Sequence, residues 1–312
     1  NHMNQRQQIS YPLQFLMLLG LVGLFMIFGS ILVAALGSNM LGVSLLQVPD
    51  ALNRPQNANI SRLLNTLATL IAFLVPAIVF AKILSKQPLS WLGFNKRMNA
   101  KQVSIVVLVT FAGMILSGSL GMLNQKIPLT EDLLKQAQQL ENAYKNAMMN
   151  MAHMTSFSDY LLAMLVMALA PAVFEEVLFR GAFQKVFVGW TKNAWAGIII
   201  TSILFSAIHF SFFGFLPRIA LGLILGLIFY YTNNLWLSIL LHFLNNGFVV
   251  TQLYILTAQG KAIDKVMDET MPMWWGSIAL VLLVILFRLL IAESNQLKTE
   301  TTVTNHEMMT EI

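Results

Sequence analysis

Five ionisable side chains in this sequence fall inside stretches that are otherwise apolar, and they are the residues best able to do chemistry. The five are Glu175, Glu176, Arg180, His209 and His242. An ionisable side chain at membrane depth is costly to place and usually marks a functional site. Carboxylates and imidazoles are also the groups that exchange protons in general acid–base catalysis. These residues are therefore the candidate site.

The first three charges lie in the segment PAVFEEVLFRG, residues 171–181, and they divide into two parts. Glu176 and Arg180 are four residues apart in the order that favours ion pairing along a helix, so this pair predicts a structural role. Glu175 points about 100° away from Glu176 around a helix axis and has no such partner. A carboxylate left unpaired in a cavity of low polarity suits a general base or acid, so we expect Glu175 to be catalytic.

The two histidines belong to pairs with helical spacing, Phe205 with His209 and His242 with Asn246. The members of each pair share one helix face, and the aromatic member is expected to pack against the site wall. Glu175 with His209 would activate a water molecule. His242 with Asn246 would donate hydrogen bonds to the oxyanion that forms at an attacked carbonyl, so the set predicts hydrolysis of a peptide bond. Asn245 is either part of this site or a hydrogen-bond donor to a neighbouring helix.

The composition of the chain indicates what kind of protein positions these candidate site residues. Of 312 residues, 57% are hydrophobic and 11% are charged, whereas a soluble domain carries about 25% charged residues. The chain is therefore a membrane protein with most of its mass in the bilayer. The net charge of +5 is spread along the chain, which predicts no nucleic-acid partner. The absence of cysteine excludes disulfides and thiolate metal sites.

Apolar stretches long enough to cross a bilayer recur eight times. They lie at about residues 13–36, 62–85, 103–122, 159–189, 194–213, 216–232, 235–256 and 272–292. Because backbone polar groups cannot cross lipid unpaired, each stretch predicts a helix. The predicted fold class is all-α, a polytopic membrane protein of about eight transmembrane helices.

The other segments complete the expected organisation. Residues 1–3 are interpreted as an expression scar, 4–158 as three spans with a long loop, 159–256 as a catalytic core of four helices, 257–292 as a loop and the eighth helix, and 293–312 as a disordered tail. The long loop predicts an amphipathic helix that begins near Thr130. We expect its apolar face to pack on the bundle or at the membrane interface, and a substrate gate is the alternative.

The candidate residues can meet only if their helices place them at one depth. Glu175 lies 16 residues before a turn near Thr191 and His209 lies 18 after it, so antiparallel helices bring the two to one level. His242 lies about 10 Å into its own helix. The short loops on the N-terminal side carry ten basic residues against eight on the other, with a cluster at 82–101. We expect cytoplasmic termini and a cavity that opens toward the cytoplasm.

Three motifs on successive predicted helices resemble the CAAX-protease and bacteriocin-processing family of intramembrane proteases, also called the ABI family. The motifs are Glu-Glu-xxx-Arg at Glu175, Glu176 and Arg180, Phe-xxx-His at Phe205 and His209, and His-xxx-Asn at His242 and Asn246. The resemblance covers about residues 159–256. It implies an eight-helix membrane endopeptidase with a conical catalytic cavity. It also implies that Glu175 and His209 activate water and that His242 and Asn246 form the oxyanion hole. The implied substrate is a membrane-associated or lipid-modified protein or peptide.

Several alternatives stay open. No cofactor is required, but Glu175, His209 and His242 could hold a zinc ion with one open position, although the His-Glu-x-x-His spacing of zinc proteases is absent. Carboxylates and histidines also relay protons in transporters, and the same fold without catalysis could be a scaffold for a partner protein. The oligomeric state is open. The expected location is the cell membrane, as a multi-pass protein of a bacterial inner membrane.

Overall fold

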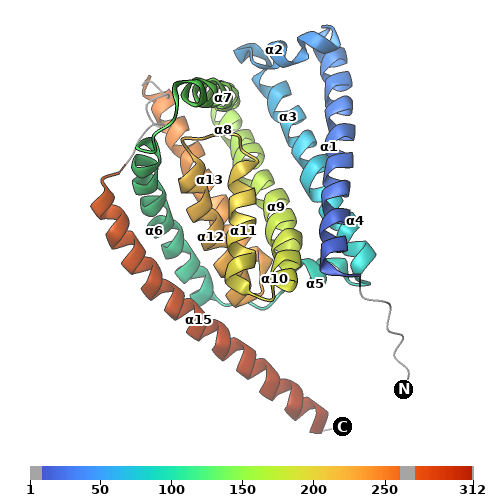
Figure 1. Cartoon of the computed structure of the whole chain (residues 1–312), viewed down its shortest axis with the longest axis vertical. Helices are drawn as coiled ribbons and strands as arrows, with labels where there is room; N and C mark the ends of the chain where they lie inside the picture. Colours follow the sequence, from blue (N-terminus) through green and yellow to red (C-terminus); the bar gives the residue numbers. More distant parts are fainter. Residues whose placement is uncertain (1–8, 261–270, 311–312) are drawn as a thin grey trace.

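Helices make up the architecture of the computed structural model, which describes residues 9–260 and 271–310 (Figure 1). The α-helices are α1 Tyr11–Leu41, α2 Val48–Leu52, α3 Ala58–Thr69, α4 Val75–Leu84, α5 Pro88–Leu92, α6 Ala100–Gln125, α7 Glu131–Met151, α8 Phe157–Ala163, α9 Ala170–Glu176, α10 Lys185–Thr191, α11 Ala194–Ala207, α12 Phe215–Thr232, α13 Leu235–Ala258 and α15 Met273–Thr310. Short 3-10 turns η1 Leu45–Gln47 and η2 Pro55–Asn57 and π-helical segments η3 Leu70–Leu74, η4 Met164–Leu169 and η5 Val177–Gln184 connect some of them. No strand occurs in these residues, so the all-α prediction is confirmed. Residues 1–3, the predicted scar, lie outside the described residues, as do 261–270 and 311–312.

Seven helices of the described chain are long and apolar enough to cross a membrane. Two of them are composite, because Pro55–Leu84 joins α3, η3 and α4, and Phe157–Thr191 joins α8 to α10. The predicted span at 194–213 is instead the 14-residue helix α11, which ends at Ala207. The chain turns there because the amides of His209 and Phe210 bond to carbonyls three residues back, and Phe210 has a φ of 50°. His209 therefore lies in a turn after α11 and not inside a helix.

The predicted disordered tail from residue 293 is wrong for the part that the structure describes. The helix α15 continues to Thr310 without a break at Glu293. The reason is a polar contact with the start of α6, where Asn99 Nδ2 donates to Glu293 Oε1 at 2.6 Å and Gln102 Nε2 donates to Ser294 Oγ at 2.9 Å. The polar residues that follow residue 292 therefore join α15 to the start of α6.

Proline follows a π-helical turn in both composite spans. Pro76 comes just after η3, and Pro171 comes just after η4. A proline has no N–H to donate, and its ring clashes with the carbonyl four residues earlier in a regular α-helix. The wider π turn accommodates this mismatch, and such turns are frequent at functional sites. Here the second of these π turns ends six residues before Glu175.

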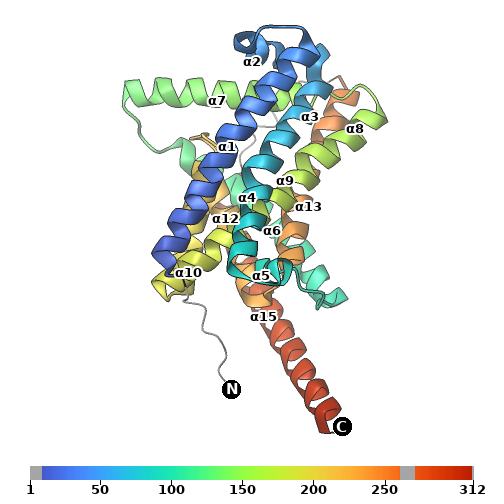
Figure 2. The ribbon, with the colours of Figure 1, turned by 90° about the vertical axis from the view of Figure 1, so that its right-hand side faces the viewer.

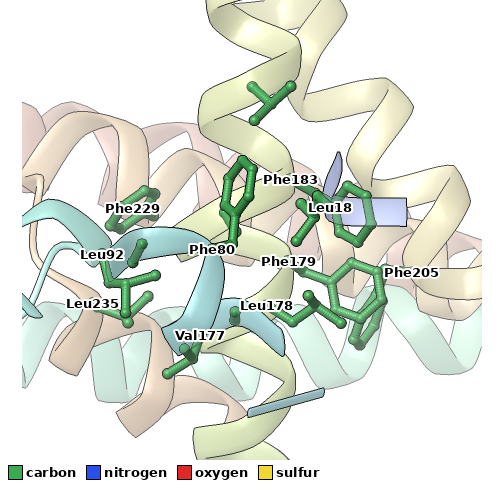
Figure 3. Close-up of a cluster of buried hydrophobic side chains, with 14 of the residues drawn as sticks. Leu18, Phe80, Leu92, Val177, Leu178, Phe179, Phe183, Phe205, Phe229 and Leu235 are labelled. Carbon is green, nitrogen blue, oxygen red and sulfur yellow. The ribbon is translucent and has the colours of Figure 1, made fainter. Parts of the chain in front are cut away.

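The main apolar core surrounds η5, whose side chains are all buried. Figure 3 shows Leu178, Phe179 and Phe183 of this segment packed against Leu18 of α1 and Phe80 of α4. Leu92, Phe205, Phe229 and Leu235 bring α5, α11, α12 and α13 into the same cluster. Because η5 follows Glu176 directly, this packing fixes the rotation and depth of the helix that carries both glutamates.

The amphipathic helix expected from Thr130 is α7, and it lies across one end of the bundle (Figures 1 and 2). Arg62 of α3 holds its last turn, since Arg62 Nε donates to the carbonyl of Met151 at 2.8 Å and Nη2 donates to that of His153 at 2.6 Å. At its other side, the Ser211 hydroxyl donates to Glu141 at 2.7 Å. The helix is therefore packed on the bundle, as the first of the two readings predicted.

Candidate active site

A cavity of about 460 Å³ lies beneath α7 and collects the candidate residues on its wall. Glu175 reaches it from α9, Phe205 from α11, His209 from the turn that follows, and His242, Asn245 and Asn246 from α13. Side chains of α3 and α7 close the wall, among them Asn65, Tyr144 and Met148. The structure therefore brings together predicted site residues that are up to 71 positions apart, from Glu175 to Asn246.

The cavity lies toward the α7 end of the molecule, whereas the first turn of α1 and the last turns of α15 lie at the opposite end (Figure 1). The combination of cytoplasmic termini with a cavity that opens toward the cytoplasm is therefore wrong. If the termini are cytoplasmic, the cavity lies toward the other side of the membrane. The direction in which the cavity opens could not be predicted, because the position of a residue within its helix does not show which end of the bundle α7 covers.

Glu176 is the centre of a buried chain of hydrogen bonds. Its Oε1 accepts from Arg180 Nη1 at 2.7 Å, as the spacing of the pair predicts, and also contacts His242 Nδ1 at 2.9 Å. Glu176 and Arg180 are fully buried, with an exposed fraction of 0% each. An acceptor at Nδ1 places the imidazole proton there and leaves the Nε2 lone pair of His242 free. Glu176 thus sets both the charge balance and the histidine tautomer.

His242 Nε2 faces Glu175, with 3.9 Å between this nitrogen and Oε2 of the carboxylate. That distance is too long for a direct hydrogen bond, but one water molecule can bond to both atoms. Glu175 Oε2 is buried and has no hydrogen-bond partner in the described residues. The two side chains therefore form the part of the cavity wall best arranged to hold and polarise water.

His209 is held from behind by its own helix end. Its Nδ1 lies 2.8 Å from the carbonyl oxygen of Phe205, so Nδ1 carries the proton and Nε2 is left as an acceptor. The Phe205 ring packs edge-on against both His209, at 5.1 Å between ring centres, and His242, at 5.9 Å. Arg180 stacks on the same ring at 4.6 Å. Phe205 therefore orients both histidines, while no ion pair or hydrogen bond within the described chain joins His209 to Glu175.

The two asparagines of α13 contact each other. Asn245 Nδ2 donates to Asn246 Oδ1 at 3.1 Å, and both side chains line the cavity. Since its oxygen is occupied, the amide nitrogen of Asn246 is the group left to donate into the cavity. The hydrogen bond of Asn245 is thus to a site residue of its own helix.

Comparison with known protein families gives a match over the segment that contains these residues. Residues 157–248 match the model of a family described as type II CAAX prenyl endopeptidase Rce1-like. This segment is Rce1-like. The Rce1-like segment runs from α8 into α13, contains every motif residue named above, and confirms the resemblance that the three motifs indicated. Comparison with curated proteins and with solved structures finds no match. The contributions of α3 and α7 to the cavity lie outside the Rce1-like segment.

The side chains of the Rce1-like segment do not fit the zinc site that the sequence left open. Within residues 9–260 and 271–310, no group of three His, Asp or Glu side chains converges on a point that could hold a metal. The Nδ1 atoms of His209 and His242 face a carbonyl and Glu176, and only His242 approaches Glu175. No catalytic step is therefore assigned to a metal.

Arg218 and Tyr144 are two of the cavity residues for which the sequence predicted no role in the site. Arg218, near the start of α12, lines the wall, and its guanidinium carbon lies 5.0 Å from the centre of the Tyr144 ring of α7. Arg218 falls at the start of the span predicted at 216–232, but no role in the site was predicted for it. The signal was an arginine in the first turn of the predicted helix, close in the sequence to His209.

Proposed function

We propose that the chain is an intramembrane endopeptidase that hydrolyses a peptide bond in a membrane-associated or lipid-modified protein or peptide. The observation that carries the proposal is the approach of Glu175 Oε2 to His242 Nε2, at 3.9 Å, on the wall of a cavity at membrane depth. The Rce1-like family, described as a prenyl endopeptidase, supports the same reaction class.

In the proposed first step, a water molecule donates one hydrogen bond to Glu175 and one to His242 Nε2. Because both hydrogens of the water are directed at these acceptors, the lone pairs of its oxygen point to the substrate. Glu175 takes one proton as the water oxygen bonds to the carbonyl carbon. Glu176 keeps His242 in the tautomer that can accept, because it binds the Nδ1 proton.

In the proposed second step, the negative charge that develops on the carbonyl oxygen accepts a hydrogen bond from Asn246 Nδ2. Such donors, aimed at a charge that appears only in the transition state, contribute about 10²–10³ to a rate. Glu175 then returns its proton to the leaving nitrogen as the C–N bond breaks, which gives an amine and a carboxylic acid. His209 faces the same cavity with a free acceptor nitrogen.

This assignment differs from the resemblance in one role. The family pattern gives His209 to the water and His242 to the oxyanion, whereas the contacts of His242 support its role in water activation. Replacement of each histidine by glutamine separates the two. We expect His242→Gln to lower kcat by about 10²-fold or more, the range for a group that assists general acid–base catalysis, and His209→Gln to lower it less. The reverse order would favour the family pattern.

The decisive experiment compares peptides of membrane fractions incubated with the purified chain and with its Glu175→Gln variant. Products that depend on Glu175 identify the substrate by mass spectrometry. Glu293→Gln is the matched control, because it removes a carboxylate that contacts α6 and not the cavity. Proteolysis that persists in Glu175→Gln would overturn the mechanism. Solute uptake into proteoliposomes that needs Glu175, without proteolysis, would support the transporter, and activity of a partner unaffected by Glu175→Gln would support the scaffold.

A further inference from the structure

Arg218 differs in its bonding from Arg62 and Arg180, two arginines that are buried in the bundle. Arg62 donates to two carbonyls and to Asn59, and Arg180 donates to Glu176 and to the carbonyl of Gly222. Arg218 lines the cavity, but its Nη1 is buried and has no hydrogen-bond partner in the described residues. The cavity wall therefore carries the Arg218 cation, and no described residue accepts a hydrogen bond from its Nη1.

The surroundings of Arg218 place one face of its guanidinium against an aromatic ring and its Nη1 against the backbone. Tyr144 covers one face, at 5.0 Å from the guanidinium carbon to the ring centre. Gly214 lies against Nη1, and a Cβ at this position would overlap that nitrogen. Stacking on an aromatic ring orients the planar group without using its N–H donors. The fixed fork can then receive two oxygens of a planar anion.

We propose that Arg218, Tyr144 and Gly214 form a subsite that binds a carboxylate of the peptide substrate and thereby selects which peptides enter. The inference rests on the proposed endopeptidase function for the identity of the ligand as a peptide. The carboxylate has two sources, the free C-terminus of the chain or an aspartate or glutamate side chain. A buried donor without a hydrogen bond costs free energy, so a ligand that supplies an acceptor to Nη1 gains affinity there.

The test uses three N-palmitoylated peptides of one apolar sequence and the purified full-length chain in detergent micelles. The first peptide ends in a carboxylate, the second in a carboxamide, and the third in a carboxamide with one glutamate next to the end. Dissociation constants are measured on Glu175→Gln, in which cleavage is blocked, and on the same chain with Arg218→Gln added.

We expect a carboxylate peptide to bind Glu175→Gln about 10- to 100-fold more tightly than the plain carboxamide, which is the range for hydrogen bonds to charged groups. The preference should disappear with Arg218→Gln. The first and third peptides show which source of the carboxylate is used. Equal binding of all three peptides, or a preference that survives Arg218→Gln, would overturn the subsite.

Two further variants separate the subsite from a loss of folding. Gly214→Ala keeps the charge but pushes on the guanidinium, so it should reduce the preference. Arg54→Gln removes an exposed arginine outside the cavity and should leave the preference unchanged. A carboxylate preference without cleavage by the wild-type chain would support the subsite and count against the endopeptidase. Cleavage without any preference would do the opposite.

Discussion

The bonding of Glu176 predicts that loss of its charge destabilises the folded protein. Its Oε1 contacts both Arg180 Nη1, at 2.7 Å, and His242 Nδ1, at 2.9 Å, and none of its surface is exposed. Glu176→Gln keeps the shape but removes the charge, so Arg180 is left buried without a counter-ion. Breaking one partner of a buried ion pair costs about 3–5 kcal/mol. We expect a loss of this size in the free energy of unfolding.

The double variant Glu176→Met/Arg180→Met tests the origin of that loss. It removes both charges and keeps the volume, so we expect it to be more stable than Glu176→Gln, because no charge is left unpaired. Both variants should lose the proposed proteolytic activity, since His242 Nδ1 loses its charged acceptor and with it the fixed tautomer.

The assay is chemical unfolding of the purified chain in mixed micelles, combined with the cleavage assay for the substrate. Lys101→Met is the control, because it removes an ion pair with Glu293 whose lysine is exposed and exposed pairs contribute little. Wild-type stability in Glu176→Gln would refute the reasoning. So would a double variant less stable than the single one.

Three other predictions follow from contacts around the cavity. Arg62→Ala should free the last turn of α7, which hydrogen exchange of residues 148–154 would detect as faster exchange, while Arg54→Ala should not change it. Phe205→Leu should lower kcat with little change in KM, because the ring that orients both histidines is lost; an unchanged kcat would contradict that role. Truncation after residue 292 should lower the unfolding temperature, whereas truncation after 299 should not, since the contacts with α6 involve residues 293 and 294.

Much of the helical pattern could be predicted, since it depends on local properties. Apolar length gave the composite spans, and Thr130 with the acidic residues after it gave the start of α7. The early end of α11 could not be predicted, because residues 208–213 remain mostly apolar and contain no glycine or proline. Only the bonds of the turn, and the positive φ of Phe210, show where the helix stops. That end moves His209 out of the helix.

The sequence alone determined the class of protein, the candidate site residues and the pairing of Glu176 with Arg180. These follow from composition and from spacing within one helix, where geometry is fixed at about 100° and 1.5 Å per residue. The tertiary structure decided which histidine approaches Glu175, that Glu176 also binds His242, that Arg218 enters the cavity, and at which end the cavity lies. Contacts between helices depend on the rotation, depth and end of each helix. Packing of many distant side chains around η5 sets these quantities, and no local pattern records them.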